Sequence, residues 1–160
     1  MKKIATSVIQ TQKIAINLAR EIFPPKADQP RAGKTKLVKK AVVVGLVGEL
    51  GSGKTVFAKG FAKGLGIKEI ITSPTFVLLK KFKIKNLKFK NFVHIDAYRV
   101  EKVKELLDLG FKGLISDPKN VILIEWADRV KSILPKNYIQ IKFKHIDKNR
   151  RKIWIIRKTR

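Results

Sequence analysis

Residues 41–65 read AVVVGLVGELGSGKTVFAKGFAKGL, and this stretch decides the fold. Residues 41–47 are almost entirely apolar, which indicates a strand buried on both faces. Residues 48–55, GELGSGKT, match the pattern G-x-x-x-x-G-K-[ST] at every fixed position. Apolar residues then recur at three- and four-residue spacing from Phe57 to Leu65, which predicts an amphipathic helix. A strand, a glycine loop and a helix in this order predict a binding site for a nucleoside triphosphate.

The residue types in this loop suit the binding of phosphate groups and a metal ion. Gly48, Gly51 and Gly53 can adopt backbone angles that other residues avoid, and they let amide groups come close to a phosphate. The amides lie at the positive end of the helix that begins near Lys54. Lys54 can reach the β- and γ-phosphates, and the hydroxyl of Thr55 is placed to bind Mg²⁺. The loop is therefore predicted to bind ATP together with Mg²⁺.

The composition indicates one domain spanning residues 1–160, with a strong positive charge. Its 44% of apolar residues can form a packed core, and no apolar run approaches the roughly 18 residues of a membrane helix. The chain contains no cysteine, which excludes disulfides and fits a cytoplasmic location. The 37 basic and 12 acidic residues give a net charge of +25, which would attract polyanions. A solvated lysine-rich surface is the alternative interpretation.

Two segments precede the first buried strand. A helix is predicted from about Ser7 to Phe23, because Ser7 and Gln10 fit a capping box and an apolar stripe follows them. A Pro-Pro pair ends this helix. Residues 24–40, PPKADQPRAGKTKLVKK, are predicted to form an exposed basic loop inserted in the domain. A loop of this length is unusual in a compact protein.

Two strands predicted after the loop end in carboxylates. The strand at 91–96 ends in Asp96, and the strand at 121–125 ends in Glu125. In a parallel sheet both strand ends face the crevice that also holds the phosphate loop. Asp96 and Glu125 are therefore predicted to lie opposite Thr55, where they would hold Mg²⁺ or position water.

The remaining segments complete a three-layer α/β fold with a mainly parallel central sheet. Alternating apolar residues predict antiparallel hairpins at 76–96 and 138–158. Short helices are predicted before Gly110 and from Ala127 to Leu134. The whole would be a P-loop NTPase fold with helices on both faces of the sheet.

Other polar residues near the predicted site are open to two interpretations. Pro74 keeps Ser73 out of helical angles, which leaves the hydroxyls of Ser73 and Thr75 on a constrained turn. Such a turn can sense a γ-phosphate, as switch segments do, or it can be an ordinary loop. His94 and His145 lack the spacing of metal ligands, so we expect both to be structural.

In their order, these motifs resemble the TsaE (YjeE) family, small P-loop ATPases required for threonylcarbamoyladenosine modification of tRNA. The matching segments are GELGSGKTVFAKGFAKGLG at 48–66, SPTF at 73–76, HIDAYRV at 94–100, ELLDLGF at 105–111 and IEW at 124–126. The resemblance runs across nearly the whole domain. The insertion at 24–40 and the large positive charge depart from the family pattern.

The resemblance implies a role for each residue of the predicted site. Thr55 and Glu125 would be the Mg²⁺ ligands, and Asp96 would be the acid important for hydrolysis. Thr75 would belong to a switch-like element, and Trp126 would pack on the nucleotide site. The phosphates would be bound by the loop residues Glu49, Leu50, Gly51, Ser52, Gly53, Lys54 and Thr55, with Lys54 also counted as catalytic beside Asp96 and Glu125. Contacts to the base would come from near Ser7 and near Arg150.

The resemblance also implies a function in a complex. ATP hydrolysis would be slow in the isolated protein and would reset a partner complex between turnovers. The partners would be the threonylcarbamoyl transferase subunit TsaD and its companion TsaB, with a possible contact to tRNA through the basic surface and no membrane partner.

Two other functions stay open at the level of sequence. One is a nucleotide or small-molecule kinase, although only Arg99 and Arg129 lie near plausible site elements for an arginine-bearing lid. The other is a non-enzymatic basic module that binds tRNA and carries a vestigial nucleotide site.

Overall fold

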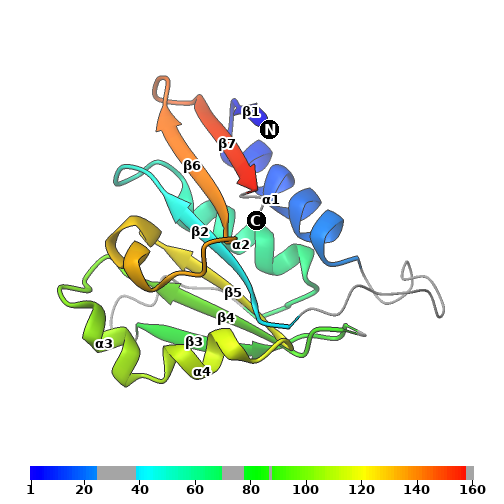
Figure 1. Cartoon of the computed structure of the whole chain (residues 1–160). Coiled ribbons are helices and arrows are strands. Elements are labelled where there is room, and N and C mark those ends of the chain that lie inside the picture. The colour runs from blue at the N-terminus through cyan, green and yellow to red at the C-terminus, as the bar shows by residue number, and fades with distance from the viewer. Residues whose placement is uncertain (25–38, 70–77, 87, 158–160) are drawn as a thin grey trace.

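The computed structural model describes residues 1–24, 39–69, 78–86 and 88–157, which form one mixed sheet with helices on both faces (Figure 1). The elements in chain order are β1 (Lys2–Ala5), α1 (Val8–Ile22), β2 (Val42–Val47), α2 (Lys54–Gly64), β3 (Leu79–Lys83), β4 (Asn91–Asp96), α3 (Val103–Asp108), α4 (Phe111–Ser116), β5 (Asn120–Glu125), the 3₁₀ helix η2 (Ala127–Ile133), β6 (Ile139–His145) and β7 (Arg151–Arg157). Among the described residues no helix combines the length and the apolar character that crossing a membrane requires.

The sheet has parallel strands at its centre and antiparallel strands at both sides. Its strand order is β1-β7-β6-β2-β5-β4-β3. Strands β6, β2, β5 and β4 are parallel to their neighbours within this group. Strand β3 pairs antiparallel with β4, β7 with β6, and β1 with β7. The three-layer α/β prediction and both predicted hairpins are confirmed.

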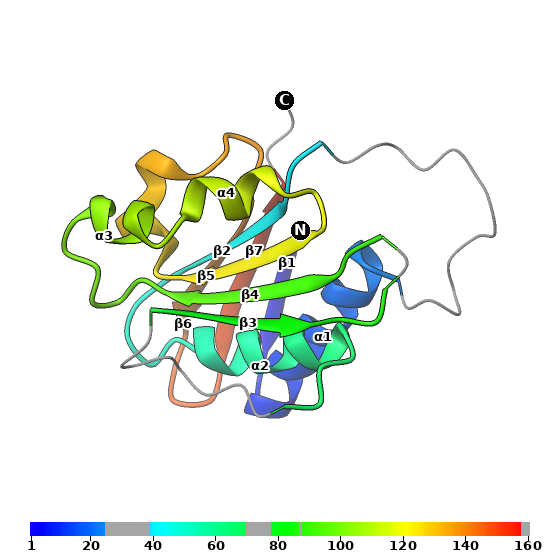
Figure 2. The ribbon, with the colours of Figure 1, turned by 90° about the horizontal axis from the view of Figure 1, so that it is seen from below.

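Two apolar clusters separate the sheet from the two helical layers, which Figure 2 shows above and below the strands. The first cluster lies under α1 and α2 and contains buried side chains from β1, β2, β4, β5, β6 and β7. The second lies under α3, α4 and η2, and its strand residues come from β2, β4 and β5. Strands β2, β4 and β5 are therefore buried on both faces, which explains their largely apolar sequences.

Helices α1 and α2 approach closely because two glycines of α2 face α1. A Cβ atom on Gly60 would lie 2.7 Å from the carbonyl oxygen of Gln12, and one on Gly64 would lie 2.7 Å from the Cβ of Ala19. Both distances are shorter than van der Waals contact. The missing side chains therefore allow α1 to lie directly on α2, which begins at the phosphate loop.

Several sequence predictions need correction or refinement. The N-terminal strand β1 was not predicted, and Gly110 is followed directly by the unpredicted helix α4, for which it is the N-cap with a φ of 82°. The predicted helix from Ala127 is a 3₁₀ helix with a kink at Val130. Ser7 caps α1 as predicted, but the side chain of Gln10 accepts from the amide of Thr6, so the capping box is only half formed.

Two predicted features lie outside the described residues. They are the turn at 73–76 with Thr75, and nearly all of the basic loop at 24–40.

The close approach of α1 and α2 predicts that Gly60→Ala destabilises the protein. Overpacking costs about 1–3 kcal/mol, which outweighs the gain of about 1 kcal/mol in helix propensity. Gly113→Ala is the matched control, because a Cβ on Gly113 in α4 would meet nothing within 4 Å. We expect urea unfolding to give a lower free energy of unfolding for Gly60→Ala and an equal or higher one for Gly113→Ala. Equal effects of the two substitutions would contradict the proposed packing.

Candidate functional site

The predicted phosphate loop connects β2 to α2 and packs tightly against β6. Gly48 has a φ of 155°, and a Cβ atom there would lie 2.8 Å from the carbonyl oxygen of Phe143 in β6. The amide of Ser52 donates to the carbonyl oxygen of Glu49 at 3.2 Å, which turns the loop, and Ser52 is fully buried. Gly53 has a φ of 102° at the N-cap of α2. The loop therefore has a shape that glycine alone fits at these positions.

Lys54 lies over this loop with its charge directed at backbone acceptors. Its side chain is buried, with 5% of the residue exposed, and its Nζ donates to the carbonyl oxygens of Gly48 at 2.7 Å and Glu49 at 2.8 Å. Burial lowers the pKa of Lys54, and nearby carboxylates, of which Glu125 has the largest effect, oppose this shift. Phosphate oxygens carry full negative charge and would be stronger acceptors for this ammonium group than the two carbonyls.

A chain of hydrogen bonds joins α2, β5 and β4 at the base of the site. The hydroxyl of Thr55 donates to Oε2 of Glu125 at 2.8 Å, and Oε1 of Glu125 lies 2.9 Å from Nε2 of His94. His94 and Glu125 are both buried. An ionised carboxylate only accepts, so Nε2 of His94 carries the proton of this bond. Both oxygens of Glu125 are thus fixed in direction.

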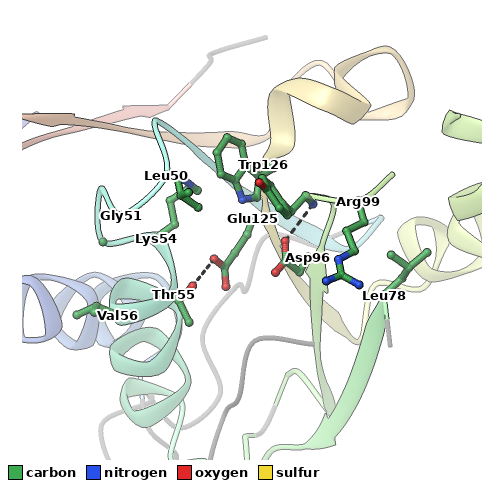
Figure 3. Close-up of a pocket in the computed structure, with 12 residues that line it drawn as sticks. Leu50, Gly51, Lys54, Thr55, Val56, Leu78, Asp96, Arg99, Glu125 and Trp126 are labelled. Atoms are coloured by element: carbon green, nitrogen blue, oxygen red, sulfur yellow. Dashed lines mark hydrogen bonds between the residues drawn. The ribbon is translucent and has the colours of Figure 1, made fainter. Parts of the chain in front are cut away.

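Asp96 lies on the strand next to Glu125, as predicted. The register of β4 and β5 places Asp96 directly opposite Glu125 at the carboxyl ends of the two strands. Oδ1 of Asp96 accepts from the amide of Tyr98 at 3.0 Å. Both carboxylates line one pocket beside the loop (Figure 3). The pocket has a volume of about 390 Å³ and is lined by Leu50, Gly51, Gly53, Lys54, Thr55, Val56, Leu78, Asp96, Tyr98, Arg99, Glu125 and Trp126.

Trp126 forms an aromatic wall of this pocket. Its ring centroid lies 3.6 Å from Nζ of Lys54 and 5.0 Å from the ring centroid of Tyr98. The guanidinium group of Arg129 lies 5.8 Å from the Trp126 ring. Trp126 has a φ of 58°, in a region that costs a residue with a side chain of this size about 1–3 kcal/mol. The contact with the Lys54 ammonium, a cation–π interaction, offsets part of this cost.

The other side of the loop is bounded by β7 and α1. A Cβ atom on Gly53 would lie 3.3 Å from Cδ of Arg151 and 3.8 Å from Cγ2 of Thr11. Arg150 pairs with Asp147 in the turn between β6 and β7 at 2.6 Å, and the base contact predicted near Arg150 stays a prediction. Arg151 is therefore the arginine that lies against the loop.

The spacing of the side-chain oxygens of Thr55 and Glu125 fits the geometry of a Mg²⁺ site. The Thr55 hydroxyl and Oε2 of Glu125 are 2.8 Å apart. Neighbouring ligands of an octahedral Mg²⁺ are separated by about 2.9 Å, since each Mg–O bond is about 2.0–2.1 Å long. The described residues contain no group of three or more His, Cys, Asp or Glu that could hold a metal. Mg²⁺ commonly keeps several water molecules and phosphate oxygens beside one or two protein ligands.

Sequence reasoning missed the contact of His94 with this site. His94 was expected to be structural, and no metal-like spacing indicated otherwise. The signal was the strand period of two, which turns residues 94 and 96 to the same face of β4. His94 therefore lies beside Glu125 from the neighbouring strand, and its Nδ1 has no hydrogen-bond partner in the described part of the chain.

The buried contact between His94 and Glu125 predicts a strong energetic coupling. The free energy of unfolding is measured in urea, without nucleotide or metal, for His94→Phe, Glu125→Leu and the double variant. We expect a coupling energy of about 1–3 kcal/mol, because each single variant leaves a buried polar group unpaired. The control is the exposed pair Lys104–Asp108, at 2.7 Å, for which alanine variants should couple by less than about 0.5 kcal/mol. Similar coupling in both pairs would disprove a fixed Glu125 carboxylate.

Both the sequence and the fold are similar to those of known proteins. Residues 7–153 match the family described as "Threonylcarbamoyl adenosine biosynthesis protein TsaE". A protein from Bacillus subtilis (strain 168), named tRNA threonylcarbamoyladenosine biosynthesis protein TsaE, is 40% identical over 111 residues, which are 69% of this chain and 66% of that protein. A protein of the same name from Treponema pallidum (strain Nichols) is 37% identical over 120 residues, which are 75% of this chain and 85% of that protein.

A solved structure agrees with the sequence matches. The crystal structure of YdiB from Bacillus subtilis is similar with a TM-score of 0.69 and 28% sequence identity, covering 97% of this chain and 83% of that chain. The family match spans the loop, the two carboxylate-ending strands and Trp126, which are the elements that build the pocket. The chain belongs to the TsaE family.

Proposed function

We propose that this protein binds ATP and Mg²⁺ at the phosphate loop, hydrolyses ATP slowly by itself, and supports the formation of threonylcarbamoyladenosine in tRNA. The observation that carries the proposal is the buried Glu125, which is fixed between Thr55 and His94 beside Lys54. The names of the family and of its relatives supply the link to tRNA modification.

The residues of the pocket have distinct proposed tasks. Thr55 and Glu125 would hold Mg²⁺, which when bound offsets the negative charge of the phosphates. Lys54 would exchange its two carbonyl acceptors for phosphate oxygens. Asp96 would orient the attacking water, because it faces the same pocket from the strand next to Glu125. Trp126 would keep Lys54 directed over the loop and limit the access of bulk water.

The slow rate and the partners follow from the proposed role in a complex. We infer that ATP hydrolysis resets a threonylcarbamoyl transferase assembly, with TsaD as the transferase subunit and TsaB as its companion, in the cytoplasm. Stimulation would come from partner contacts that order the elements around the pocket, since catalysis of phosphoryl transfer is mostly positioning and charge stabilisation.

The proposal predicts that Thr55→Ala and Glu125→Ala abolish function in a reconstituted system. With TsaD, TsaB, tRNA and ATP, we expect each variant to lower ATP hydrolysis by about 10²-fold or more, because charge stabilisation in the transition state is lost. The same variants should prevent repeated turnover in tRNA modification. Lys112→Ala, at an exposed position on α4, is the control and should behave as wild type.

Three results would contradict the proposal. Fast ATP hydrolysis by the isolated protein, with no gain from partners, would refute the regulatory role. Transfer of labelled phosphate to a small acceptor would favour a kinase. Full tRNA modification with both variants would favour a non-enzymatic tRNA-binding module.

A second prediction concerns His94 as a positioning residue. We expect His94→Leu to raise the Mg²⁺ concentration for half-maximal ATP hydrolysis by about 10- to 100-fold, as loss of a residue that orients a metal ligand does. His94→Gln should recover much of this loss, because its amide N–H can replace Nε2 as the donor to Glu125. If both variants have a lower melting temperature but the same dependence of ATP hydrolysis on Mg²⁺ as the wild type, His94 has only a structural role.

A further inference from the structure

One face of the sheet at β1, β7 and β6 is not covered by the described helices. The opposite face of these strands contributes Ala5, Ile141, Phe143, Ile153 and Ile155 to the cluster under α1 and α2. The cluster under α3, α4 and η2 contains no residue from β1, β6 or β7. In Figure 1 the helices of that second layer lie beside β2, β5 and β4, whereas β6 and β7 extend beyond them.

The strand register identifies the side chains on this uncovered face. Residues directly opposite each other in neighbouring strands lie on the same face. Trp154 pairs with Lys142 on one side and with Lys2 on the other. Lys152 is likewise opposite Lys144 and Ile4. We call the surface formed by these residues the open face; its members are Lys2, Ile4, Lys142, Lys144, Lys152 and Trp154.

The open face is cationic and contains no carboxylate from its own strands. The sequences of β1, β6 and β7, KKIA, IQIKFKH and RKIWIIR, include no Asp or Glu. Nζ of Lys152 lies 5.6 Å from the ring centroid of Trp154, which is only partly buried. Four ammonium groups thus surround an accessible indole ring. A polyanion with flat apolar groups is complementary to such a surface.

Protection of a sheet edge does not explain this arrangement. Lysines often guard edge strands against aggregation, and Lys2 on β1 can have this role. Strands β6 and β7 are interior, since each is hydrogen-bonded to a neighbour on both sides. Solubility alone accounts for lysines but not for an accessible Trp154 between them, or for Ile4 at 52% exposure.

We propose that the open face binds RNA, with its lysines on the phosphates and an unpaired base stacked on Trp154. Sheet surfaces that bind single-stranded RNA combine these two features, because every base has a face that can stack and every nucleotide carries a phosphate. The identity of the RNA as tRNA, which has unpaired loops, rests on the proposed function. Lys152 of this face directly follows Arg151, which lies against Gly53 of the phosphate loop from the other face of β7.

The first test separates this face from general attraction by the +25 charge. Affinity for fluorescently labelled tRNA is measured by anisotropy at a fixed salt concentration. Lys142→Glu/Lys152→Glu changes two residues of the open face, and Lys59→Glu/Lys112→Glu makes the same charge change at exposed positions on α2 and α4. We expect the first pair to weaken binding by about tenfold or more and the control pair by less than about threefold, because local phosphate contacts add to the long-range field.

The second test examines stacking on Trp154. Trp154→Leu should weaken binding of tRNA by about 5- to 100-fold, the range that corresponds to loss of one base–aromatic stack. Trp154→Phe keeps an aromatic ring and should retain most of the affinity. Binding of inorganic polyphosphate, which has no bases, should be equal for wild type and both variants.

The outcomes distinguish this inference from the proposed function. Equal losses in the two charge variants, or no binding of tRNA by the wild type, would overturn the open face as an RNA site. Open-face variants that bind RNA with unchanged affinity but whose ATP hydrolysis is no longer stimulated by TsaD and TsaB would also overturn it. That result would assign the face to a protein partner. If the wild type fails to hydrolyse ATP while the open-face variants, unlike the control variant, lose affinity for tRNA, the proposed function is wrong and the RNA site is supported.

Discussion

The site depends on one buried carboxylate whose two oxygens are bound from different elements. Glu125 ends β5 and is almost fully buried, and an unpaired charge in such a place would cost several kcal/mol. Thr55 from α2 and His94 from β4 remove that cost and also set the direction of the carboxylate. The phosphate loop, the first helix after it and two neighbouring strands are therefore held in one geometry, and the pocket lies where they meet.

The two halves of the sheet differ in how the described helices cover them. Strands β2, β5 and β4 are covered on both faces, and the pocket lies at their carboxyl ends. The described helices cover only one face of strands β6, β7 and β1. The loop packs against Phe143 of β6 and lies beside Arg151 of β7 on the covered face, and the sequence neighbours Lys142, Lys144 and Lys152 lie on the open face. A contact on that face would thus be only a few residues away from the phosphate loop.

Local patterns predicted the loop, both carboxylate-ending strands and both hairpins, because their signals lie within short segments. Strand β1 was not predicted, because four residues are too few to show a clear apolar pattern. Its partner, β7, lies at the far end of the chain, so no local signal indicates the pairing. The contact of His94 with Glu125 depends on the register of two strands, which no single segment reveals. The left-handed backbone of Trp126 and the position of its ring over Lys54 likewise have no signal in the local sequence.

We propose that Thr55 and Glu125 hold a metal ion together with ATP, directly beside His94. The chain has two histidines, so the ring signals of His94 can be assigned in a proton NMR spectrum by substitution of His145. Mn²⁺ added with ATP in place of Mg²⁺ should broaden the His94 signals strongly in the wild type and much less in Thr55→Ala. Bound Mn²⁺–ATP that leaves the His94 signals of the wild type sharp would contradict the account.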